Sequence, residues 1–139
     1  MRMESGHEAE DFRKKSVLAV CWAGTDRSQY IAEELNRRNY FATSAGVLKN
    51  NNHAVSNYVT PADLSNVGIV VFASIHERNV FCKDEKLKAI VKKNGIEVRV
   101  LNITESDKDR AHNYGKVEEL KAEISKQLDC IGLKDLTNQ

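Results

Sequence analysis

The sequence predicts a single α/β domain built on a parallel sheet. Short apolar runs alternate with amphipathic helical patterns from one end of the chain to the other, which is the order of repeated strand–helix–strand units. Such units connect parallel strands by right-handed crossovers. The 139 residues are enough for one domain with its own core. We therefore expect one compact α/β unit, without internal repeats.

Four segments have the composition of strands: residues 17–20, 41–44, 68–73 and 96–101. Residues 17–20 are apolar throughout, as in a central strand that is covered on both faces. Residues 96–101 alternate apolar and charged side chains, with Glu97 and Arg99 on one face. This alternation predicts a strand at the edge of the sheet.

Helical patterns fill the stretches between these strands. Residues 28–39 form an amphipathic pattern that ends at Asn39, and Thr60-Pro61 has the capping hydroxyl and first-turn proline of a helix start. Residues 75–81 and 84–93 are also helical, and Asn94-Gly95 ends the second of them. Residues 115–128 carry an apolar stripe along one helical face.

The two ends differ in composition from the centre. Residues 1–15 mix charges of both signs and are interpreted as a solvated arm, whereas residues 132–139 are interpreted as a tail. The α/β domain is expected over residues 16–131. The charged N-terminus is unlike a signal peptide, and no apolar run approaches the ~18 residues of a membrane-spanning helix.

Charge and cysteine content limit the partners. The net charge of +1 gives no indication of nucleic acid or of a membrane surface. Three scattered cysteines are too few for a disulfide framework or a zinc site. An odd number of them, including one that looks reactive, fits a reducing cytoplasm.

The strongest chemical pattern follows the first predicted strand. Cys21 is separated by five residues from Arg27, which Ser28 follows directly. A loop of this length can direct successive backbone N–H groups at one anion. The helix that begins near Ser28 adds the positive end of its dipole, and the planar fork of Arg27 matches two phosphate oxygens.

The same positive field favours a thiolate at Cys21, to which the Ser28 hydroxyl can donate. A nucleophile beneath a bound phosphate would form a phosphocysteine that water then hydrolyses. A cysteine after an apolar strand is more often a core residue, but the strand, the glycine, the Arg-Ser pair and the helix start occur together here. The expected phosphate-binding residues are Trp22, Ala23, Gly24, Thr25, Asp26, Arg27 and Ser28.

Residues 16–128 resemble the low-molecular-weight protein tyrosine phosphatases, and most closely the small bacterial branch of predicted tyrosine phosphatases. In that family an apolar strand leads into Cys-x5-Arg-Ser, and Ser-Ala-Gly follows the second strand, as Ser44-Ala45-Gly46 does here. The resemblance implies a four-stranded parallel sheet flanked by helices, hydrolysis of phosphate monoesters, and neither a metal nor another cofactor. It also implies that Ser44 supports the phosphate loop.

The family's general acid is an Asp in a Leu-Asp-Ile-Pro-Asp segment, which residues 101–105 resemble. Glu105 stands at the acid position, without the proline, so Glu105 is the first candidate for the general acid. Asp107 is the second candidate and Asp109 the third. Gly24 replaces the usual loop Asn, and Asp26 is an unexpected acid within an anion site. We interpret Asp26 as pointing outward, where it would accept N–H groups of the loop or helix.

The sequence predicts a cysteine-dependent phosphatase acting on a phosphorylated protein or a small phosphomonoester, with phosphotyrosine or another aryl phosphate favoured. One alternative is a phosphate-binding module with little turnover. Another is a thiol redox enzyme resembling arsenate reductase, but the expected partner of Cys82 is replaced by Ala89. Trp22 either lines the mouth of the pocket or packs against the first helix. The oligomeric state stays open.

Overall fold

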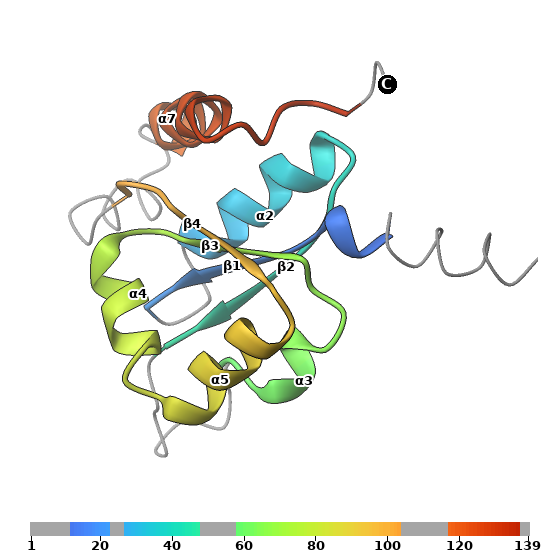
Figure 1. The fold of residues 1–139 in the computed structure, drawn as a ribbon. Helices are drawn as coiled ribbons and strands as arrows, with labels where there is room; N and C mark the ends of the chain where they lie inside the picture. The colour runs from blue at the N-terminus through green and yellow to red at the C-terminus, as the bar shows by residue number, and fades with distance from the viewer. Residues whose placement is uncertain (1–11, 23–26, 48–57, 104–116, 137–139) are drawn as a thin grey trace, which may run out of the picture.

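The computed structural model describes residues 12–22, 27–47, 58–103 and 117–136. Its centre is a four-stranded parallel sheet in the order β2-β1-β3-β4 (Figure 1). The strands are β1 (Ser16–Cys21), β2 (Phe41–Gly46), β3 (Ile69–Phe72) and β4 (Glu97–Val100). The predicted α/β fold with a parallel sheet is therefore confirmed.

Helices cover both faces of the sheet (Figure 1). The helices α2 (Arg27–Arg37) and α7 (Val117–Cys130) pack on one face, and α3 (Pro61–Leu64), α4 (Ile75–Phe81) and α5 (Glu85–Lys93) pack on the other. All six residues of β1 are buried, as its apolar run predicts, because alternate side chains enter the two cores. The edge position expected for the strand around Glu97 is also confirmed.

The predicted ends of the helices agree closely with the structure. Thr60 caps α3 with a reciprocal capping box to Asp63. Asn39 adopts a positive φ of 73° just beyond α2, and Gly95 adopts 62° beyond α5, so both residues end helices as expected. Most bounds differ from the predicted ones by one or two residues. For example, α2 begins at Arg27 rather than at Ser28, and β2 extends to Gly46, which pairs with Cys21.

Both terminal segments contact the domain where they are described. Phe12 packs on Phe41 with 4.7 Å between ring centroids. The carbonyl of Arg13 lies against Gly68, where a Cβ atom would come within 2.2 Å of the carbonyl oxygen, so glycine is required at this approach. At the other end, Leu133 is buried and the Leu136 N–H donates to the Arg38 carbonyl. The segment expected to be a tail thus packs on the domain as far as residue 136.

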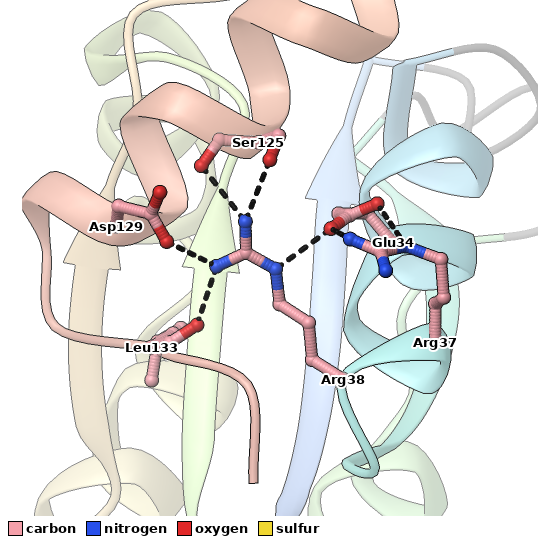
Figure 2. Close-up of polar contacts among 6 residues, drawn as sticks. All are labelled: Glu34, Arg37, Arg38, Ser125, Asp129 and Leu133. Carbon is pink, nitrogen blue, oxygen red and sulfur yellow. Dashed lines mark hydrogen bonds and ion pairs between the residues drawn. The ribbon is translucent and has the colours of Figure 1, made fainter. Parts of the chain in front are cut away.

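Arg38 forms hydrogen bonds to residues of both α2 and α7 (Figure 2). Its exposed fraction is 3%. Its Nε donates to Glu34 at 2.7 Å, and its Nη1 donates to Asp129 at 2.8 Å and to the Leu133 carbonyl at 2.9 Å. Its Nη2 donates to the carbonyl and the hydroxyl of Ser125 at 3.0 and 2.7 Å. The five N–H donors of a guanidinium are thereby all used within the protein.

Candidate functional site

The candidate nucleophile stands where β1 ends and its exposed fraction is 1%. The Cys21 thiol donates to the Ser28 hydroxyl oxygen over 3.1 Å, although seven positions separate the two residues. Ser28 is the second residue of α2 and is fully buried. Sulfur and hydroxyl therefore meet beside the N-terminus of an 11-residue helix, as the Cys-x5-Arg-Ser spacing predicts.

Arg27 begins α2 and is 2% exposed. Its Nη1 donates to the Ile103 carbonyl at 2.8 Å, just beyond β4. The same Nη1 lies 2.7 Å from Oε1 of Glu77, in an ion pair whose angle is not that of a hydrogen bond. The guanidinium thus joins the start of α2 to α4 and to the segment after β4.

Glu77 is the residue of this site that sequence reasoning missed. It lies in the first turn of α4, has no exposed surface, and accepts the Ser74 hydroxyl at its second carboxylate oxygen. Ser74 in turn caps α4 by accepting from the His76 N–H. The pattern Ser74-x-x-Glu77, directly after an apolar strand, is a helix-start signature that would have placed this carboxylate at the sheet edge. No local sequence pattern predicts its ion pair with Arg27, because the two residues are far apart in the sequence.

These contacts lie at the carboxyl end of the sheet, at the position where the order of strand addition reverses. From β1 the chain passes to β2 on one side, and then crosses to β3 on the other side of β1. Cys21 is the last residue of β1, and Ser74 follows β3 after one intervening residue. Open α/β sheets bind ligands in the crevice outside the carboxyl ends of such strands, so a ligand is expected near the ends of β1 and β3.

Trp22 packs on the face of the sheet opposite to the one that α2 covers. It is half-buried against the core on the α4 side of the sheet, and its indole stacks on the His76 ring with 5.2 Å between centroids and 23° between planes. His76 is exposed, and the neighbouring Ile75 is 54% exposed. The residue directly after Cys21 is therefore one member of a stacked aromatic pair, and the other member comes from α4.

Ser44 lies within β2, where it pairs with Ala19 and is half-buried. It precedes by two positions the Cys21–Gly46 pair that ends the sheet. Its predicted support of the phosphate loop stays a prediction, because part of that loop is outside the described residues. Also outside them are Ala23, Gly24, Thr25, Asp26, Glu105, Asp107 and Asp109.

Other features of the described residues lie apart from this site. A surface hollow of about 460 Å³, bordered by Phe12, Phe41 and Asp63, lies near the amino ends of β1 and β2. None of the three cysteines, which all lie in the described ranges, forms a disulfide bond. Within the described ranges, no three His, Cys, Asp or Glu side chains gather as metal ligands would, and no helix is long and apolar enough to cross a membrane.

Comparison of the chain with models of protein families, with curated proteins and with solved structures finds no match. The chain therefore carries no family assignment from these comparisons, and its resemblance to low-molecular-weight phosphatases stays a prediction. Its function is inferred from the contacts of Cys21, Arg27 and Ser28.

Proposed function

We propose that the protein is a cysteine-dependent phosphatase of the low-molecular-weight type, which hydrolyses phosphate monoesters through a phosphocysteine. One observation carries this proposal: a buried thiol lies 3.1 Å from the Ser28 hydroxyl at the first turn of α2. Helix N-termini bind anions through free N–H groups and stabilise thiolates. Ser28 can reverse its hydrogen bond and donate to Cys21 once the sulfur is deprotonated.

In the first step, the Cys21 thiolate attacks phosphorus. The S–P bond forms, the P–O ester bond breaks, and the leaving oxygen takes a proton from a carboxylic acid. In the second step, that carboxylate removes a proton from water, whose oxygen attacks phosphorus. The S–P bond breaks, which regenerates the thiolate and releases inorganic phosphate. The role of Arg27 is to stabilise the charge on the equatorial oxygens of both transition states.

The proton donor is assigned to Glu105, with Asp107 as the second candidate. Two facts support this choice. Glu105 follows Ile103 by only two positions in the sequence, and the Ile103 carbonyl accepts a hydrogen bond from Arg27 in the structure. Positioned acids contribute about 10²–10⁴-fold. Glu105→Gln should therefore lower kcat about 100-fold for an ester with a poor leaving group, and less for a good one. If Glu105→Gln and Asp107→Asn both stay within about twofold of the wild type, the acid is elsewhere.

An aryl phosphate is the proposed substrate, as a phosphotyrosine protein or a small ester. The Trp22 ring, directly after Cys21, stacks on the His76 ring and favours this class, because an aromatic leaving group gains from stacking on flat rings. We place the reaction in the cytoplasm, where a free nucleophilic thiol persists. Against a redox role, Cys82 caps the far end of α4 and packs into the opposite core from Cys21.

The decisive experiment compares the wild type with Cys21→Ser on phosphotyrosine, phosphoserine and small aryl phosphates. Phosphate release by the wild type, its loss in the variant, and a preference for the aryl esters are the expected results. A phosphorylated Cys21, trapped by rapid acid quench and identified by mass spectrometry, is the matching intermediate. Tight phosphate binding without turnover by the wild type would instead favour the binding module.

A further inference from the structure

We infer that Glu77 is the positioning residue of the phosphate site: it fixes the orientation of Arg27 and also cancels its charge. This inference rests on the proposed function and adds to it how the arginine is held. It predicts that the protein has lower affinity for free phosphate than an unopposed arginine would give. In exchange, the guanidinium is held in one orientation for the reaction.

The contacts of Glu77 allow little freedom. Its carboxylate has no exposed surface, one of its oxygens accepts the Ser74 hydroxyl, and the other lies 2.7 Å from Nη1 of Arg27. Ser74 is itself fixed as the N-cap of α4. The same nitrogen of Arg27 also donates a hydrogen bond to the Ile103 carbonyl. The orientation of the arginine is therefore determined by two elements that are far from it in sequence.

The charge argument is separate from the orientation argument. Arg27 and Glu77 are both at least 98% buried, so water screens their charges poorly. A carboxylate within a few ångströms of an anion site, at an effective dielectric constant near 20, weakens anion binding by about tenfold or more. Removing only this charge should strengthen phosphate binding, whereas loosening the guanidinium should slow the reaction.

The test uses Glu77→Gln with Glu34→Gln as its matched control. Glu34 is the other glutamate that pairs with a buried arginine, but it lies beside Arg38, in the Ser125 and Asp129 cluster. We expect Glu77→Gln to lower kcat about 10- to 100-fold, the cost of a small misplacement of a binding group. We expect its dissociation constant for inorganic phosphate, measured by calorimetry at pH 7, to fall about tenfold or more. Glu34→Gln should change neither quantity.

Ser74→Ala separates the two effects and also serves if Glu77→Gln does not fold. It keeps the charge of Glu77 but removes the hydroxyl that holds it. We expect kcat to fall about 2- to 5-fold for loss of one such hydrogen bond, with phosphate affinity unchanged. Thermal melts show whether each variant is folded. A kcat within twofold of the wild type in the folded variants would overturn the inference.

Two further results would also overturn it: weaker phosphate binding by Glu77→Gln, or an equal loss of kcat in Glu34→Gln. Failure of the proposed function is distinguishable from these. If the wild type binds phosphate but hydrolyses no ester, the function fails, while the phosphate affinities of the two glutamine variants still decide the role of Glu77. If the wild type binds no phosphate, both proposals are overturned.

Discussion

The two ends of α2 each hold a buried arginine in a different way. Arg27 begins the helix and Arg38 follows its last residue, about 16 Å away along the axis. Arg38 directs all five N–H donors at α2, α7 and the C-terminal segment (Figure 2). Arg27 pairs with a fully buried carboxylate, and it precedes Ser28, whose hydroxyl accepts from the Cys21 thiol. Burial alone therefore does not identify a functional arginine, and the neighbouring groups distinguish the two.

This difference also separates what each arginine would contribute. Arg38 connects helices that pack on the same face of the sheet, so its loss should be seen in the free energy of unfolding. Arg27 lies near the carboxyl end of β1, where the order of strand addition reverses. Its loss should therefore be seen in catalysis. Substitutions at the two positions are expected to affect different measurements.

The largest effect is expected for Arg27→Lys, with a fall in kcat/KM of about 10³-fold. Loss of one oxyanion donor typically costs 10²–10³-fold, and a lysine ammonium cannot reproduce the bidentate fork. Steady-state kinetics on an aryl phosphate give the measurement. The matched variant Arg38→Lys should keep kcat/KM near the wild-type value. Nearly wild-type activity in Arg27→Lys would mean that the loop does not bind phosphate as proposed.

Arg38→Met should lower the free energy of unfolding by about 3 kcal/mol, measured by urea denaturation. Removing one partner of a buried ion pair costs about 3–5 kcal/mol. The lower value is expected because Asp129 is 62% exposed and water solvates it in the variant. The folded fraction should retain the wild-type kcat. A large loss of kcat with unchanged stability would reverse the roles assigned to the two arginines.

Glu34→Gln should lower stability by about 1 kcal/mol at pH 7, the size of a typical net hydrogen bond, because its partner Arg37 is exposed to solvent. Hydrogen bonding to Arg37, which outweighs burial and is aided by Arg38, lowers the pKa of Glu34 from its usual 4.5. A lowered folded pKa stabilises the protein above the unfolded pKa, and this contribution is lost as the pH falls through the folded value. Urea unfolding of both proteins from pH 7 to 3 should show the gap closing. A gap that stays constant would contradict this assignment.

The smallest effect is expected for Asp129→Ala, which should lower the free energy of unfolding by about 0.5 kcal/mol. Its side chain is 62% exposed, and exposed ion pairs contribute little because solvent and salt screen them. Chemical denaturation at low and high salt provides the measurement, and the difference should shrink in high salt. A loss as large as that of Arg38→Met would show that the cluster depends on Asp129 rather than on the arginine.

Much of the fold could be predicted because its signals are local. The apolar run of β1, the alternation around Glu97 and the Thr60-Pro61 start each act through neighbours in sequence, and the structure confirms all three. The Cys21–Ser28 contact was predictable for the same reason, since it spans only seven positions. Its proposed role in phosphate chemistry stays a prediction.

The sequence by itself determined the α/β class, the bounds of the elements to within about two residues, and the thiol beside a helix start. The tertiary structure alone decided which charges are partnered. Glu77 meets Arg27 across 50 positions, and Arg38 reaches Asp129 across 91. Such pairs form only when the sheet order and the helix packing bring distant segments together, so no local pattern of residues encodes them. The same reason explains why the two arginines at the ends of α2 have different surroundings in the folded protein.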